Sequence, residues 1–357
     1  MGILDKLKKN TNIKDSSLLS ESIFFTEKDM IATDIPALNI ALSGSLSGGF
    51  VPGLTMWAGP SKHFKTGFTL MMVKAYLDTY EDAAVLFYDS EFGSPQSYFE
   101  AMGIDPDRVF HSPITDVEQL KFDIMNQLQN VERGDKLIIV IDSIGNLASK
   151  KEVDDALDQK SVADMSRAKQ IKSLFRMVTP HLTLKNIPMV VVNHTYKEIG
   201  MFPKDIVGGG TGSYYSADNI FILGRQQEKD GTEIIGYNFI INVEKSRYVK
   251  EKSKIPVSTT FEGGISRWSG LMDLALESGH VIKPKNGWYA KVDSDGVIQG
   301  KNFRFDETQN SDFWNPILED ERFQEFIEKK YKISNGPIIS DEDIEQAYEE
   351  AWWEKKI

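Results

Sequence analysis

The alternation of short apolar runs with longer amphipathic stretches constrains the fold of this chain more than any other feature. From residue 54 to about residue 260, the strand-like runs "LTMWA", "AVLFYD", "KLIIVID", "IPMVVVN", "NIFILG" and "YNFIINVE" alternate with helical patterns. One of these helices, in "DVEQLKFDIMNQLQNVERG", is expected to end at Gly134. Unbroken apolar strands separated by helices are typical of a largely parallel, twisted sheet with helices on both faces. We therefore predict an α/β core over residues 31–270, preceded by an N-terminal segment at 1–30 and followed by a small C-terminal α/β domain at 271–357, which contains a hairpin turned by "DSDG".

Composition excludes several kinds of chemistry. The chain has no cysteine and five scattered histidines, which excludes disulfides, thiolate catalysis and cysteine-ligated metals. A metal is then expected to be a hard ion that accompanies a nucleotide. The apolar runs are too short to cross a bilayer, so we expect a soluble protein without a membrane partner. The net charge of −12 opposes nucleic-acid binding by the body as a whole, although basic stretches such as "SRAKQIKSLFR" leave local binding open.

The segment "AGPSKHFKTGF" fits a phosphate-binding loop between a strand and a helix. In such a loop the helix N-terminus attracts an anion, a lysine reaches the β- and γ-phosphates, and the next hydroxyl binds Mg²⁺. Lys65 and Thr66 hold those positions, but Phe64 replaces a glycine, at a cost on the order of 1–2 kcal/mol if its φ is positive. A chance strand–turn–helix is the alternative. The nucleotide-binding candidates are Gly59, Pro60, Ser61, Lys62, His63, Phe64, Lys65, Thr66 and Gly67.

Acidic residues follow two further strands. Asp142 and Ser143 come directly after "LIIVI", and Glu91 comes after "AVLFYDS". The carboxyl ends of parallel strands form the ligand-binding edge of a sheet, where Asp142 can hold the Mg²⁺ shell and Glu91 can polarise the attacking water. Each acid alone is more often part of a turn or a cap. Together with the loop, they predict an ATPase that uses ATP and Mg²⁺.

Ordered motifs make the chain similar to the RecA-type recombinases, in particular to their T-even phage branch. The motifs are "FFTEKD", "GPSKHFKT", "FYDSEFG", "IDSIGNLASKKE", "NHTY", "GGGTG", "VEKSR" and "KPKNGWYA". The resemblance implies a RecA-like P-loop ATPase core, and it makes a bulky residue before the loop lysine a trait of the phage branch. It therefore implies a working loop, in which either the helix starts one residue early or the strain at Phe64 is tolerated.

The resemblance also assigns roles in the nucleotide site. It makes Lys65, Glu91 and Asp142 catalytic, matches Tyr98 to the aromatic residue that stacks on adenine, and puts His194 where RecA has a glutamine that senses the γ-phosphate. A histidine donates a hydrogen bond as that glutamine does but also titrates near neutral pH, so we expect the coupling chemistry to differ. From the residues alone, Tyr98 is equally a core tyrosine and His194 a structural histidine.

Two DNA-binding loops follow from the same resemblance. The segment 195–218 is long for a loop and matches the second one, in which glycines admit a phosphate and apolar residues wedge between bases. The segment "ASKKEVDDALDQKSVADMSRAKQ" matches the first, although its acids suit a phosphate contact poorly. Arg167 matches a DNA-contacting arginine of the family. Lys169 and Lys172 are DNA-binding candidates because of their charge alone, and a solvated helix face is the alternative for them. The DNA-binding candidates are Arg167, Lys169, Lys172, Ile199, Phe202, Gly209, Gly210 and Thr211.

Two further segments are expected to contact neighbouring subunits. By the resemblance, Lys245 and Arg247 reach the γ-phosphate bound by the next subunit. Phe24 and Phe25 would anchor the N-terminal oligomerisation segment in a neighbour's groove, although a contact within the chain fits the sequence equally well. ATP would then lie between subunits, and a head-to-tail interface that does not close produces a helical filament.

These expectations describe a recombinase with single-stranded-DNA-dependent ATPase activity. It would form filaments on single-stranded DNA and pair that strand with homologous duplex in recombination, repair and replication. Further expected partners are a loader protein, a single-stranded-DNA-binding protein and helicases, in the cytoplasm of a phage-infected bacterium. The alternatives are a RecA-fold ring helicase, which would need an N-terminal collar, and a non-hydrolysing ATP-gated filament scaffold, which Phe64 suggests and Glu91 opposes. The acidic tail of the chain, "DEDIEQAYEEAWWEKKI" at residues 341–357, either competes with DNA, binds the loader or forms a solvated helix.

Overall fold

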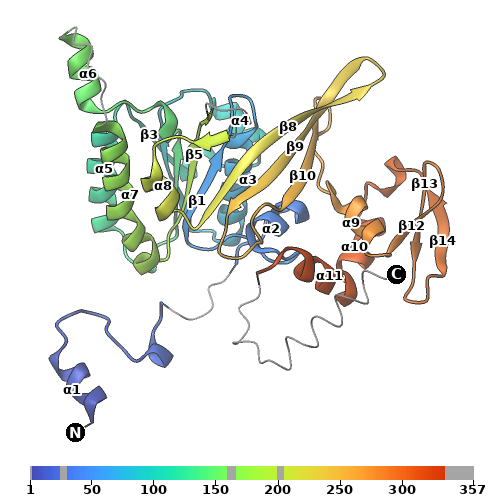
Figure 1. Cartoon of the computed structure of the whole chain (residues 1–357), viewed down its shortest axis with the longest axis horizontal. Coiled ribbons are helices and arrows are strands. Elements are labelled where there is room, and N and C mark those ends of the chain that lie inside the picture. Colours follow the sequence, from blue (N-terminus) through green and yellow to red (C-terminus); the bar gives the residue numbers. More distant parts are fainter. Residues whose placement is uncertain (1, 25–29, 159–165, 199–204, 334–357) are drawn as a thin grey trace.

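A large mixed sheet forms the centre of the protein (Figure 1). The structure, a computed structural model, describes residues 2–24, 30–158, 166–198 and 205–333. Within these residues the sheet has nine strands in the order β11-β10-β9-β8-β1-β5-β4-β2-β3. The strands from β8 to β3 run parallel, and β9, β10 and β11 continue the sheet in antiparallel fashion. Their bounds are β1 Gly53–Ala58, β2 Ala84–Asp89, β3 Val109–Pro113, β4 Leu137–Asp142, β5 Pro188–Asn193, β8 Asn219–Asp230, β9 Glu233–Lys245, β10 Lys254–Thr260 and β11 Gly264–Ile265.

Helices cover both faces of the parallel part of the sheet because its strands are apolar on both sides. Along β4, Ile138 and Val140 belong to one buried cluster, whereas Ile139 and Ile141 belong to another. Side chains that alternate in this way point to opposite faces of the sheet. The prediction of a parallel α/β core is therefore confirmed. The first cluster is covered by α2 (Pro36–Ser43) and α3 (Lys65–Thr79), and the second by α5 (Val117–Asn130) and α7 (Ser166–Lys185).

Most local patterns predict the elements correctly, with some exceptions. The six apolar runs singled out in the sequence became β1, β2, β4, β5, β8 and β9, whereas β3 and β10 were not anticipated. The helix that we expected to end at Gly134 ends at Asn130 instead. A tight turn stops it, in which Glu132 N donates to Asp135 Oδ2 and Asp135 N donates to Glu132 O.

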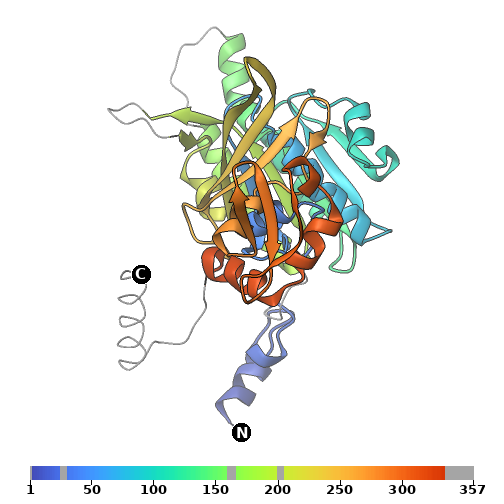
Figure 2. The ribbon, with the colours of Figure 1, turned by 90° about the vertical axis from the view of Figure 1, so that its right-hand side faces the viewer.

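A small C-terminal unit lies beside the antiparallel end of the sheet (Figures 1 and 2). It contains a three-stranded sheet whose β13–β14 hairpin turns at "DSDG", as the sequence predicts. The cluster beneath α3 extends to Trp314 and Phe323, so this unit shares its apolar core with the main sheet. The elements are α9 Leu271–Glu277, β12 Val281–Lys285, β13 Trp288–Val292, β14 Ile298–Phe303, α10 Ser311–Leu318 and α11 Glu321–Tyr331.

The N-terminal region stands away from the sheet in both views. Helix α1 (Ile3–Asn10) exposes Ile3, Leu4 and Leu7 to solvent. The expected acidic tail lies outside the described residues. No helix in the described part of the chain is long and apolar enough to span a membrane. The domain boundaries near residues 30 and 270 stay predictions.

Candidate nucleotide and DNA site

The phosphate loop connects β1 to α3, and Phe64 in it has a left-handed backbone. Its φ is 61° and its ψ is 23°, and α3 begins at Lys65, so the helix does not start one residue early. The strain is accommodated by packing: the Phe64 ring stacks on Phe239 with centroids 5.2 Å apart and meets Phe68 edge-on at 5.5 Å. Gly67 leaves room for the ring, because a Cβ there would lie 2.4 Å from its carbons. The phenylalanine is therefore a packed part of the loop.

Lys65 and Thr66 start α3 at the edge of the sheet. Lys65 Nζ donates to Pro60 O at 2.9 Å, and burial lowers the pKa of this amine. Thr66 Oγ1 donates to Asp142 Oδ2 at 2.6 Å, which connects the loop to the end of β4. A lysine and a hydroxyl at a helix N-terminus are the groups that a triphosphate with its cation requires.

Asp142 is a buried acid with one unused oxygen. It is 3% exposed, and no described residue donates a hydrogen bond to its Oδ1. Burial raises the pKa of Asp142 to about 6, against the opposing hydrogen bond from Thr66. A buried carboxylate oxygen beside a threonine hydroxyl is the kind of ligand set that Mg²⁺ prefers, and a cation there would remove the cost of burying the charge. These residues therefore fit the expected metal.

Glu91 is held by two donors at the same oxygen. Its Oε1 accepts from His194 Nε2 at 2.8 Å and from Ser143 Oγ at 2.7 Å. The hydrogen bond from His194, assisted by that from Ser143, lowers the pKa of Glu91 to about 2 although burial opposes it. The structure thus brings together the ends of β2, β4 and β5, as the sequence predicted for residues at the ends of parallel strands.

Asp89 is a residue of this site that our sequence reasoning missed. It is 4% exposed, and its Oδ1 accepts from the backbone N of Glu91 at 3.0 Å and of Phe92 at 2.8 Å. These bonds fix the turn that presents Glu91. The acid at the very end of the strand in "FYDSE" was the available signal, since such residues often bond the backbone two or three positions later.

The cleft around these groups has a volume of about 740 Å³. Residues 61–67 of the phosphate loop, Glu91 and His194 line it. Tyr98 in α4 (Gln96–Ala101) also lines it, and burial raises the pKa of its phenol. Residues of β8 to β11, among them Arg225, Phe239 and Ile265, complete the wall. The residues assigned to triphosphate and adenine therefore share one cleft.

His194 also contacts the segment that follows β4. A Cβ on Gly145 would lie 2.5 Å from His194 Cδ2, so the glycine allows the ring to lie against this segment. Arg167 holds the same segment: its Nε donates to Leu147 O at 2.6 Å, and its Nη2 donates to the carbonyls of Ile144 and Gly145 at 3.0 and 2.8 Å. In this structure the Arg167 guanidinium therefore binds backbone, and its contact with DNA stays a prediction.

The remaining DNA candidates gather where α7 meets α8 (Thr211–Ser216). Gly209 and Gly210 have φ values of 87° and 74° and lie against α7, which exposes Lys169 and Lys172. The proposed loop leaves the sheet through a ribbon of β6 (Thr195–Lys197) and β7 (Asp205–Val207). Ile199 and Phe202 lie outside the described residues.

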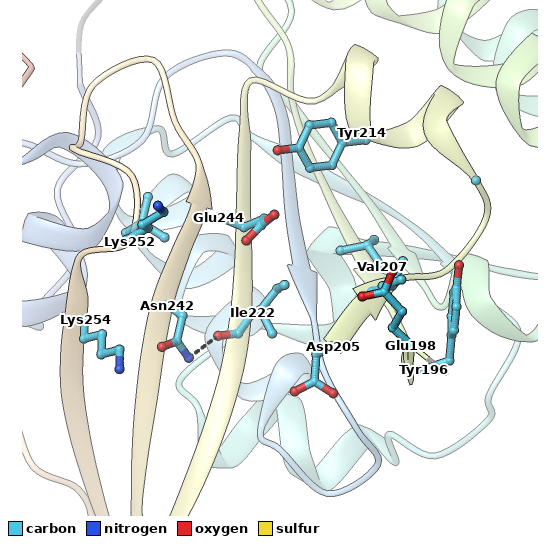
Figure 3. Close-up of a pocket in the computed structure, with 13 residues that line it drawn as sticks. Tyr196, Glu198, Asp205, Val207, Tyr214, Ile222, Asn242, Glu244, Lys252 and Lys254 are labelled. Carbon is cyan, nitrogen blue, oxygen red and sulfur yellow. Dashed lines mark hydrogen bonds between the residues drawn. The ribbon is translucent and has the colours of Figure 1, made fainter. Parts of the chain in front are cut away.

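A second cleft lies between this ribbon and strands β8 to β10 (Figure 3). Its volume is about 800 Å³, slightly more than that of the nucleotide cleft. Its wall mixes acids such as Glu198 and Glu244 with Lys252 and Lys254 and contains no phosphate-loop residue. The smaller cleft, in contrast, is lined by the phosphate loop and Glu91, and Thr66 in its wall donates to the buried Asp142.

The candidates for contacts between subunits have partners within the chain. Lys245 Nζ donates to the carbonyls of Tyr214 and Ala217 at the end of α8, at 2.9 and 2.7 Å. Arg247 pairs with Asp218 at 2.5 Å, and its side chain is 69% exposed. Neither cation lines the nucleotide cleft of its own chain in the described structure, which leaves a role toward a neighbour as a prediction.

Phe24 has a partner within the chain as well, since the Arg133 guanidinium lies 5.1 Å from its ring centroid. Phe25 lies outside the described residues. The role of Phe24 and Phe25 as an anchor in a neighbouring subunit therefore stays a prediction.

Comparisons with known proteins identify relatives over nearly the whole chain. A family described as the RecA N-terminal domain matches residues 14–266, and one described as the C-terminal domain of the bacteriophage T4 recombination and repair protein matches residues 268–327. The recombination and repair protein of Enterobacteria phage T4 is 50% identical over 97% of this chain and 89% of its own length. Protein RecA of Streptomyces rimosus is 27% identical over 87% of this chain and 79% of its own length, and that of Streptomyces venezuelae is 28% identical over 86% and 77%.

Asp142→Asn tests the charge of the buried acid. In the folded protein the pKa of Asp142 is about 6, above its value in the unfolded chain. The wild-type protein is therefore most stable at low pH, where Asp142 is neutral, and loses this contribution to its free energy of unfolding as the pH rises through 6. Without nucleotide, the variant should be more stable than wild type by on the order of 1–3 kcal/mol near pH ~8 and no more stable near pH ~4. Calorimetric unfolding measures this, with the exposed Asp295→Asn as control. A difference that does not change with pH would contradict the assignment.

Proposed function

The chain belongs to the RecA family of recombinases, and from that premise we propose that it is an ATP-hydrolysing recombinase that forms helical filaments on single-stranded DNA and exchanges strands with homologous duplex. The resemblance that the sequence motifs indicated, including that to the T-even phage branch, is confirmed by these matches. One observation carries the ATPase part of the proposal: Thr66, which donates to the buried Asp142, and Glu91 line the same cleft as the phosphate loop.

ATP would bind with its triphosphate on the loop and its adenine against Tyr98. Lys65 would exchange its bond to Pro60 O for the β- and γ-phosphates, which gains a charge-assisted contact for a buried amine. Thr66 and Asp142 would hold Mg²⁺, which would neutralise charge on the phosphates when bound.

Glu91 would orient the attacking water. With a pKa of about 2 the carboxylate is ionised at neutral pH, but it is a weak base. Glu91 is therefore better suited to orient the attacking water through a hydrogen bond than to remove a proton from it completely. Its two donors, His194 and Ser143, would set how freely the carboxylate can accept from water.

His194 would couple DNA to this step, because it both donates to Glu91 and directly precedes the ribbon from which the proposed DNA loop extends. DNA would be held through its backbone and by stacking, with little sequence preference, since base pairing judges homology. Occupancy of the loop would move His194 and change the hydrogen bonding of Glu91.

The filament would place each nucleotide between two subunits. Lys245 and Arg247 would serve the neighbour's ATP, and the segment at 1–30 would hold the next subunit. A loader, a single-stranded-DNA-binding protein and helicases would act with the filament in the cytoplasm of a phage-infected bacterium. ATP turnover stimulated by single-stranded DNA separates this function from a non-hydrolysing scaffold, and strand exchange separates it from a helicase.

Lys65→Ala should abolish ATP binding and ATP-dependent binding to single-stranded DNA while the protein stays folded, because the lysine serves phosphates and not the core. Nucleotide titration and DNA-stimulated ATP turnover measure the effect. Lys74→Ala, which removes a partly exposed cation that pairs with Asp78 on the same helix, is the matched control and should bind ATP as wild type does. Undiminished ATP binding by Lys65→Ala would refute the phosphate-loop assignment.

A mixture of two inactive variants tests the shared site. Glu91→Gln lacks the water-orienting carboxylate, and Arg247→Ala supplies no cation to its neighbour, so each alone should be inactive. In an equal, randomly ordered filament, about a quarter of the interfaces join an intact glutamate to an intact arginine, and about a quarter of wild-type turnover should return. Electron microscopy of the mixture establishes co-assembly. A co-assembled mixture without activity would show that Arg247 does not act across the interface.

A further inference from the structure

One face of the β8–β9 hairpin is directed at the phosphate loop. In the hairpin register Leu223 pairs with Ile241, Arg225 with Phe239, and Gln227 with Tyr237. Opposed residues in an antiparallel pair share a face, and so do residues two positions apart on one strand. Leu223, Arg225, Tyr237 and Phe239 therefore form a single surface, which we call the hairpin face.

Three contacts join the hairpin face to the loop. Arg225 Nη1 donates to Lys62 O at 3.0 Å, and its guanidinium lies 4.6 Å from the Tyr237 ring centroid. Phe239, which is 3% exposed, stacks on Phe64. At the start of the loop Gly59 is so close to β8 that a Cβ on it would lie 3.3 Å from Leu223 O.

Two of these contacts fall on the two loop residues that are conformationally strained. Lys62 and Phe64 have φ values of 60° and 61°, and both carry side chains that disfavour the left-handed region. Such conformations persist only where the surroundings enforce them. Arg225 holds the carbonyl of the first residue, and Phe239 holds the ring of the second.

We propose that the hairpin face is a clamp that keeps the phosphate loop in its nucleotide-binding conformation, with Arg225 and Phe239 as positioning residues. This inference rests on the proposed ATP site. The clamp acts on the loop backbone before ATP arrives, so its loss should weaken ATP binding and leave turnover at saturating ATP intact.

The clamp is attached to α8, a helix that lies within the segment 195–218 of the proposed DNA loop. Strand β8 begins shortly after α8 ends, and the end of β9 returns to α8 through the bonds of Lys245 to Tyr214 O and Ala217 O. One hairpin therefore contacts both the nucleotide loop and the DNA side of the molecule.

Arg225→Gln tests the clamp in the full-length protein, with calorimetric titration of Mg²⁺-ATP and steady-state turnover on single-stranded DNA. The dissociation constant and KM for ATP should rise about tenfold, and kcat should change less than about twofold. Lys229→Gln is the matched control, because it removes a cation about 13 Å further along the same strand and should bind ATP as wild type does.

A rescue distinguishes positioning from direct contact with phosphate. Glycine adopts positive φ without strain, so Lys62→Gly in the Arg225→Gln protein should restore most of the lost affinity. If Arg225 instead touched the phosphates, Lys62→Gly would restore nothing and kcat would fall, which would overturn the proposal. Wild-type affinity in Arg225→Gln would also overturn it. Failure of the wild-type protein itself to bind ATP would refute the proposed function, and the clamp with it.

Discussion

The site depends on one constraint of parallel sheets: neighbouring strands deliver their carboxyl ends to the same edge. Residues far apart in the chain meet there because Asp89 on β2 lies beside Asp142 on β4, and Ala58 on β1 beside Asn193 on β5. The loop, Glu91, Ser143 and His194 each follow one of these strand ends. Hydrogen bonds then connect these strand ends to one another. Thr66 Oγ1 donates to Asp142, and Glu91 Oε1 accepts from Ser143 and His194.

Sequence reasoning found the parts of this edge that local patterns encode. The apolar strands, the loop lysine and the acids after β2 and β4 could be predicted because strand periodicity and the residue after a strand are local properties. The conformation of Phe64 and the role of Arg225 could not, because both depend on β8–β9 pairing that brings distant residues to the loop. Asp89 was missed for a simpler reason, since its bonds to the next turn resemble an ordinary cap.

His194 is the point where the nucleotide and DNA sides of the proposed mechanism meet. On one side it donates to the Glu91 carboxylate, and on the other its ring lies against Gly145, whose carbonyl Arg167 holds. Both proposed DNA loops are thus connected to the His194 imidazole, the first through Arg167 and Gly145 and the second because it directly follows His194 in the chain. In the proposed mechanism a histidine would serve in the place of the family's glutamine, because the proposed coupling requires a donor to Glu91 and either side chain supplies one.

The most direct test of the coupling compares His194→Gln with His194→Leu in ATP turnover with and without single-stranded DNA. Both variants should still bind ATP, because the phosphate contacts come from the loop. If His194 transmits DNA occupancy by donating to Glu91, the glutamine variant should keep DNA-stimulated turnover and the leucine variant should lose the stimulation. Full stimulation of the leucine variant would contradict the account, since DNA would then reach Glu91 by another path.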